Sequence, residues 1–158
     1  MTDAARELNK VLDAEHAAVY AYGVIGARLS GGRRSFARAG FDAHRARRDQ
    51  IRGLVIARGG TPSEPMAAYQ LPFPVATAGD AARLAALIED RVTAAYLELT
   101  AVPDSALRRL AALAMQESTV RGFGWQPVIP ALPGHPRPAP AASPTATASG
   151  TPPVSLPQ

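Results

Sequence analysis

The sequence predicts an all-α protein in which four long helices form a bundle, followed by a tail rich in proline and alanine. Three observations predict this fold. Apolar residues recur every three or four positions in four segments, as in helices packed along one side. Each segment ends near glycine or proline. Two of the three connections are short and one is long. With 158 residues, the chain is long enough for one domain with a core.

The first two predicted helices cover residues 3–29 and 33–58. The sequence "SGG" at 30–32 follows the first helix, and "GGTP" at 59–62 follows the second, so both helices end at favourable stop residues. Because only a short Gly-rich turn joins them, we expect the two helices to form an antiparallel hairpin.

The third predicted helix covers residues 80–101, and the fourth runs from about Pro103 to just before Pro127. Thr77 and Asp80 have the spacing of a capping box at the start of the third helix. Proline suits the first position of a helix, which places the start of the fourth helix at Pro103. The short connection predicts a second antiparallel hairpin.

The connection between the hairpins is about 20 residues long and contains four prolines. An extended segment of this length can span about 60 Å, whereas a helix of 25 residues is only about 38 Å long. The connection can therefore cross the full length of the bundle. We expect its apolar residues to pack along the outside, and these are Met66, Tyr69, Leu71, Phe73 and Val75.

Residues 131–158 differ sharply in composition from the rest of the chain. They include eight prolines and no Phe, Trp or Tyr, so they cannot bury enough apolar surface to offset the loss of chain entropy. We therefore expect two regions, a helical bundle at 1–130 and a disordered tail rich in Pro, Ala, Ser and Thr at 131–158.

Each predicted helix carries a polar residue near its middle, on or beside its apolar stripe. These residues are Glu15, His44, Glu89 and Glu117. A buried carboxylate destabilises a fold unless it is paired, protonated or bound to a metal. Carboxylates and imidazole from facing helices are the ligands of dinuclear iron or manganese sites in helical bundles. The four residues are therefore candidate metal ligands.

Four motifs resemble a group of small bacterial ferritin-like domains of unassigned function. They are "LDAEHAAVYAYGVIGARL", "AHRARRDQIRGLVIARGGTP", "YQLPFPV" and "LIEDRVTAAY", and the resemblance covers about residues 3–130. It implies a ferritin-like four-helix bundle and a homodimer, and it implies no established activity.

The chain departs from the ligand pattern of the ferritin superfamily at several positions. Val120 and Arg47 stand where histidines are expected, and His44 replaces a glutamate. Guanidinium groups pair with carboxylates and stay charged, so they compete with metal ions for the same ligands. This favours a buried polar network in place of a metal site. Its candidate members are Glu15, His44, Arg47, Arg48, Glu117 and Arg121.

These observations leave three functions open. The first is a non-catalytic scaffold or binding module with a degenerate dimetal site and no cofactor. The second is a divergent di-iron or manganese protein or oxidase. The third uses the eight arginines of residues 33–58, which stand against two aspartates. Arg38, Arg45 and Arg52 repeat every seven residues and could bind nucleic acid or an acidic protein.

The remaining expectations concern location and single residues. No signal peptide precedes the first helix, and no apolar stretch reaches the roughly 18 residues of a membrane span, so we expect a cytoplasmic protein without membrane contact. His16 follows Glu15 and points about 100° away from it around the helix, so we expect it at the surface or the bundle edge. We expect Tyr22 and Tyr96 to pack in the core.

Overall fold

The computed structural model describes residues 2–129 and 131–135, and within these residues it confirms the predicted all-α class. Four helices and no strands are present in this part of the chain: α1 Asp3–Ala27, α2 Gly31–Ala57, α3 Ala78–Leu99 and α4 Ser105–Trp125. None of these helices combines the length and the apolar character that a membrane span requires.

Side-chain caps fix the starts of three helices. Thr2 accepts a hydrogen bond from the amide of Ala5 at 3.2 Å. Thr77 and Asp80 form the predicted capping box, in which each side chain accepts from the backbone of the other residue. The predicted start of α4 at Pro103 is wrong by two residues, because Asp104 is the cap and the helix begins at Ser105. A side-chain cap contributes about 1 kcal/mol.

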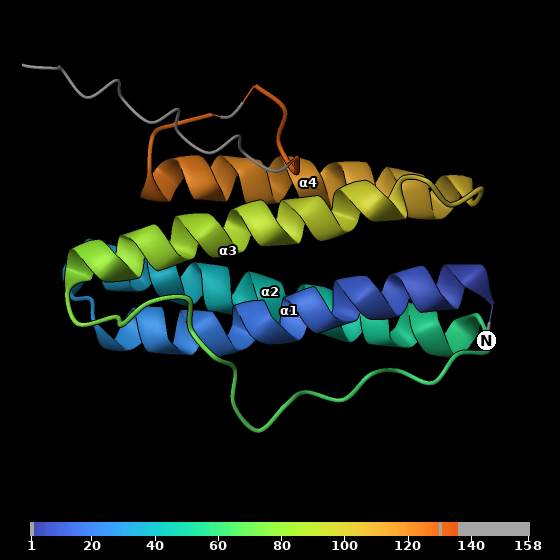
Figure 1. The fold of residues 1–158 in the computed structure, drawn as a ribbon, viewed down its shortest axis with the longest axis horizontal. Helices are drawn as coiled ribbons and strands as arrows, with labels where there is room; N and C mark the ends of the chain where they lie inside the picture. The colour runs from blue at the N-terminus through green and yellow to red at the C-terminus, as the bar shows by residue number, and fades with distance from the viewer. Residues whose placement is uncertain (1, 130, 136–158) are drawn as a thin grey trace, which may run out of the picture.

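The four helices form two antiparallel hairpins stacked on each other (Figure 1). The closely packed helix pairs are α1–α2, α3–α4 and α1–α3, so the second hairpin rests on the first mainly through α3. The chain between α2 and α3 runs outside the α1–α2 pair from one end of the bundle to the other (Figure 1). This arrangement places the middles of all four helices at the same level, where the polar residues of the core lie.

The long connection is held to α1 by polar and aromatic contacts. Asn9 donates to the carbonyl of Thr61 at 2.9 Å and accepts from the amide of Ser63 at 3.0 Å. The ring of Tyr69 lies 5.4 Å from that of Tyr20. His16 also contacts the carbonyl of Ser63, at 3.2 Å. His16 is only 5% exposed, so the surface position, one of the two expected for it, is wrong.

The apolar residues of the connection behave differently along its length. Val75 is buried, and Leu71 and Phe73 pack against the core, as expected. Met66 is 60% exposed, so the expectation that it packs on the bundle is wrong.

Gly40 allows α2 to approach α1 closely at one point. A Cβ atom built on Gly40 would lie 2.3 Å from the ring of Tyr22, a distance that real Cβ atoms do not show. Any larger residue would displace this tyrosine, which is 1% exposed. The absence of a side chain at Gly40 therefore leaves the space that the Tyr22 ring occupies.

The predicted boundary at residue 131 falls within the described part of the chain. Residues 131–135 return to α3, and a Cβ atom on Gly134 would lie 3.2 Å from the side chain of Leu97. The rest of the predicted tail, residues 136–158, lies outside the described residues.

Candidate functional site

Three charged side chains meet in the middle of the bundle. Glu15 comes from α1, His44 from α2 and Glu89 from α3, and each is at most 2% exposed. His44 lies between the two carboxylates. Its Nδ1 is 2.8 Å from Oε2 of Glu15, and its Nε2 is 3.1 Å from Oε1 of Glu89. Three of the four candidate metal ligands are thus brought together, with the imidazole bridging the two glutamates.

Two tyrosines, expected only to pack in the core, complete this cluster. Tyr96 on α3 donates to Oε1 of Glu15 at 2.7 Å, and Tyr22 on α1 donates to Oε1 of Glu89. The pairing is reciprocal, because each helix receives a hydrogen bond from the tyrosine of the other. Trp125 at the end of α4 donates to the hydroxyl of Tyr22 at 2.9 Å.

A repeated spacing explains the reciprocal pairing. Glu15 and Tyr22 are seven residues apart on α1, and Glu89 and Tyr96 are seven residues apart on α3. Seven residues are about two helical turns, so both side chains of a pair face the same way. Because α1 and α3 run antiparallel (Figure 1), the glutamate of one helix lies opposite the tyrosine of the other. This E-x₆-Y pattern, present in both α1 and α3, is the sequence signal from which the pairing could have been predicted.

The arginines expected in the network have three different environments. Arg121 on α4 donates to Oε2 of Glu89 at 3.0 Å and joins the buried cluster. Arg47 and Glu117 form an ion pair at the edge, where the side chain of Glu117 is 55% exposed. Arg48 pairs with the neighbouring Asp49 at 2.7 Å. The expectation that Arg48 lies in the buried network is therefore wrong.

The buried cluster of Glu15, His44, Glu89 and Arg121 contains two carboxylates and two cations, provided that His44 is protonated. Burial lowers the pKa of His44, but the hydrogen bonds to Glu15 and Glu89 and the charges of these carboxylates outweigh burial and raise this pKa to about 9. Burial opposes ionisation of Glu89, yet His44, Arg121 and Tyr22 together hold its pKa below the ordinary value. At neutral pH the two cations of the cluster balance its two carboxylates, so its net charge is zero.

The tyrosines of this cluster stay protonated. Burial raises the pKa of Tyr22, and the charge of Glu89 and the hydrogen bond to it raise it further. Burial likewise raises the pKa of Tyr96, with Glu15 adding to the effect. Both hydroxyls are therefore fixed as donors to a carboxylate. This favours a static hydrogen-bonded network over a site where a tyrosine loses its proton.

The arrangement does not fit a dinuclear metal site. Each carboxylate oxygen of Glu15 and Glu89 accepts a hydrogen bond, and both ring nitrogens of His44 are used. Glu117, the fourth candidate ligand, pairs with Arg47 at the edge. Within the described residues, no three His, Cys, Asp or Glu side chains are placed to hold one metal ion. A metal would have to displace several hydrogen bonds and approach two cations.

The candidate anion-binding arginines on α2 have different surroundings. Arg52 pairs with Glu64 of the long connection at 2.8 Å. Arg38 and Arg45 instead border a groove between α1 and α2. The nearest carboxylate to Arg38 is that of Asp42, at 3.9 Å.

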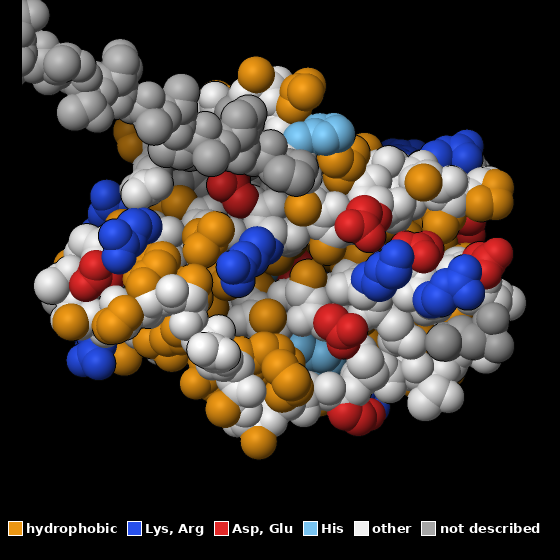
Figure 2. All heavy atoms as spheres, viewed as in Figure 1, with side chains coloured by type: hydrophobic (Ala, Val, Ile, Leu, Met, Phe, Trp, Pro, Cys, Tyr) orange, Lys and Arg blue, Asp and Glu red, His pale blue; other side chains and the backbone are white. Residues whose placement is uncertain are grey.

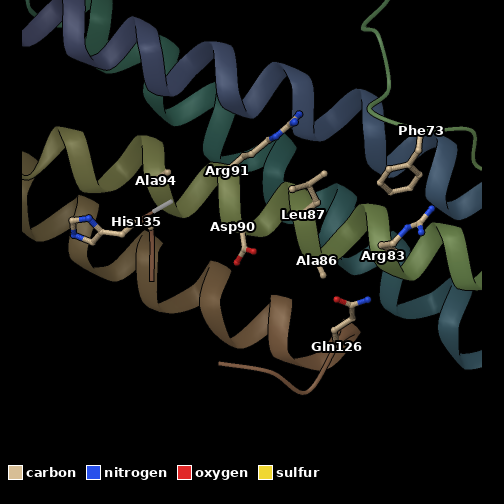
Figure 3. Close-up of a pocket in the computed structure, with 10 residues that line it drawn as sticks. Phe73, Arg83, Ala86, Leu87, Asp90, Arg91, Ala94, Gln126 and His135 are labelled. Carbon is tan, nitrogen blue, oxygen red and sulfur yellow. The ribbon is translucent and has the colours of Figure 1, made fainter. Parts of the chain in front are cut away.

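A second hollow lies against α3 and has a volume of about 490 Å³. Arg83 stacks on the ring of Phe73, 4.0 Å from its centroid. Figure 3 shows Asp90 and Arg91 pointing in different directions from α3, with His135 at the far end of the hollow. These side chains do not converge on one point, so this hollow has no catalytic constellation.

Comparisons with known proteins assign no activity to this arrangement. Residues 7–137 match the family described as a domain of unknown function, DUF4439. The chain is also similar to the crystal structure of a conserved hypothetical protein, rv2844, from Mycobacterium tuberculosis. The identity is 33%, the match covers 82% of this chain and 99% of that chain, and the TM-score is 0.76. No curated protein matches the sequence.

Proposed function

This chain belongs to the family described as a domain of unknown function, DUF4439, and we propose that it is a non-catalytic scaffold or binding module. In this proposal the fold is a ferritin-like bundle whose dimetal site is replaced by the buried cluster. One observation carries the proposal. His44 bridges Glu15 and Glu89, which uses both ring nitrogens and places a cation where two carboxylates would otherwise hold metal.

The small space around the cluster supports a structural role. The cavity beside Glu15, His44 and Arg47 has a volume of about 10 Å³. A single water molecule needs about 10–15 Å³ by this kind of measure, so no substrate of ordinary size can reach the carboxylates. The cluster instead links α1, α2, α3 and α4 through charged hydrogen bonds, which are stronger than neutral ones.

Added metal is expected to leave the melting temperature of the protein unchanged. A ligand that binds only the folded state must stabilise it, and the cluster leaves no free carboxylate oxygen or ring nitrogen for one. The measurement is thermal unfolding of chelator-free protein with and without iron(II) or manganese(II), together with elemental analysis. A metal-dependent rise of several degrees that disappears in Glu15→Ala and Glu89→Ala would support the divergent di-iron or manganese protein instead.

The nucleic-acid alternative has less support than the scaffold. Arg52 is paired with Glu64, so Arg38, Arg45 and Arg52 do not act as three free cations in a row. On the face shown in Figure 2, acidic and basic side chains are interspersed, which disfavours binding of a long polyanion across that face.

We further propose that the domain forms a homodimer through α4. Leu113, Val120 and Phe123 share one face of this helix and are 49%, 67% and 47% exposed. Residues 113 and 123 lie equally far from position 118, so two antiparallel copies of α4 would bring Leu113 of each copy opposite Phe123 of the other. Such self-complementarity is what a two-fold interface requires, and apolar faces of this kind often mark interaction sites.

Changing Val120 to glutamate is expected to shift the protein from dimer to monomer, because it places a charge in the centre of this apolar face. Light scattering after size-exclusion chromatography, over a range of concentrations, measures the mass. Ile56→Glu is a matched control, since Ile56 is 59% exposed on α2 and lies outside the proposed interface. A wild-type protein that is monomeric at every concentration would contradict the proposal.

A further inference from the structure

A groove with a volume of about 550 Å³ separates α1 from the first half of α2. It lies apart from the buried cluster and is bordered by basic side chains of α2 and small residues of α1. Its polar and aromatic lining includes Arg34, Arg38, Phe41, Asp42 and Arg45. Grooves and clefts of about 300–1,000 Å³ are the usual size of small-molecule sites.

The α1 side of the groove is open because two of its lining residues have no side chain. A Cβ atom built on Gly23 or Gly26 would meet nothing within 4 Å, so a larger residue there would project into free space. Gly40 lets the helices approach closely at Tyr22, which also lines the groove. One wall of the groove is therefore formed by the backbone of α1 at Gly23 and Gly26, where no side chain projects into the space.

The arginines of the other wall are only partly neutralised by the protein. Among the described residues, the side chain of Arg34 forms no ion pair and no hydrogen bond. The guanidinium of Arg45 lies over the ring of Phe41, 5.7 Å from its centroid. Arg38 is 3.9 Å from Asp42. Three cations and one anion give the groove a net charge of +2. Most other arginines in this part of the chain pair with a carboxylate, as Arg47, Arg52 and Arg58 do.

We propose that this groove binds a phosphorylated small molecule. Guanidinium groups bind phosphate oxygens through paired hydrogen bonds, and a net charge of +2 matches a phosphate dianion. The bare backbone at Gly26 and the ring of Phe41 leave room for an apolar or flat body attached to the phosphate. Arg52 lies outside the groove and pairs with Glu64. The positive charge is therefore confined to a short region, which suits a small anion better than a long polyanion.

Titration of the full-length, isotope-labelled protein with ATP tests this proposal, with adenosine and a 20-nucleotide single-stranded DNA as comparison probes. Amide chemical shifts locate binding, and their concentration dependence gives the affinity. We expect ATP to shift the amides of Gly23, Gly26, Arg34 and Arg38. Adenosine should bind at least tenfold more weakly, because it lacks the phosphates that pair with the arginines.

Two variants and two matched controls separate the groove from general charge effects. Arg38→Gln removes one cation and Gly26→Leu fills the groove without changing charge, and each should weaken ATP binding about tenfold or more. Arg109→Gln on α4 and Gly53→Leu on α2 make the same changes outside the groove and should leave affinity within about twofold. Gly53, like Gly26, has nothing within 4 Å of a built Cβ atom.

Three results would overturn the proposal. The first is an absence of ATP-induced shifts at the groove. The second is equal weakening in the groove variants and their controls, which would indicate nonspecific charge attraction. The third is binding of the DNA alone, with shifts extending to Arg52, which would restore the nucleic-acid alternative.

Discussion

Replacing His44 with alanine is expected to lower the free energy of unfolding by about 3–5 kcal/mol, the typical effect of breaking a buried ion pair. The change removes the cation between Glu15 and Glu89, which are each 1% exposed. Glu15 would then keep only the hydrogen bond from Tyr96, and Glu89 would keep those from Tyr22 and Arg121. Urea-induced unfolding followed by circular dichroism measures the change.

Arg48→Ala is the matched control for this variant. Arg48 lies one turn after His44 on the same helix, but it pairs with the exposed Asp49, so its loss should change the free energy of unfolding by less than about 1 kcal/mol. The double variant Glu15→Gln, His44→Gln should lower the free energy of unfolding by less than the sum of the effects of Glu15→Gln alone and His44→Gln alone. The reason is that fewer charges are left unpaired in the double variant. Equal decreases in the free energy of unfolding for His44→Ala and Arg48→Ala would show that the cluster does not stabilise the fold.

Stability is expected to fall by about 3 kcal/mol between pH 6.5 and 9, through the titration of His44. The pKa of this histidine rises from the ordinary 6.5 to about 9 on folding. A raised folded-state pKa gives a contribution that is fully present below pH 6.5 and is lost as pH rises to about 9. Each unit of difference corresponds to about 1.4 kcal/mol. Urea unfolding midpoints measured across this range test the slope.

The charged and titratable groups around His44 define the controls for the pH experiment. Glu15, Glu89 and Tyr96 face it from α1 and α3, Arg121 belongs to α4, and Arg47 lies on its own helix. His44→Gln should remove most of the slope, whereas Arg48→Ala, which leaves His44 and its partners in place, should preserve it. A wild-type protein whose stability does not change between pH 6.5 and 9 would contradict a charged His44.

The helices could be predicted from the sequence because their signals are local. Glycine and proline mark the helix ends, and the capping box of Thr77 and Asp80 lies within four residues. The placement of Arg48 failed for a physical reason. A long side chain near the edge of an apolar stripe can turn to a carboxylate on its own helix, and Asp49 is the adjacent residue. Helical spacing alone does not distinguish these two orientations.

The site was only partly predictable, because its contacts join residues far apart in the chain. Helical spacing placed Glu15 and His44 on the apolar stripes and left Glu89 on or just beside its stripe. The bridging position of His44 depends on how three helices meet. The burial of His16 depends on the path of the long connection, to which the carbonyl of Ser63 belongs. Nothing in the spacing of α1 encodes that path. The roles of Tyr22 and Tyr96 required comparison of two helices at once.

The central claim is that His44 is a protonated cation between two buried carboxylates. Nitrogen-15 NMR of the histidine side chains, recorded on metal-free protein from pH 6 to 10, tests it most directly. We expect both ring nitrogens of His44 to carry a proton at pH 7.5 and the ring to titrate near pH 9. A neutral ring with one protonated nitrogen at pH 7.5, titrating at or below 6.5, would contradict the account.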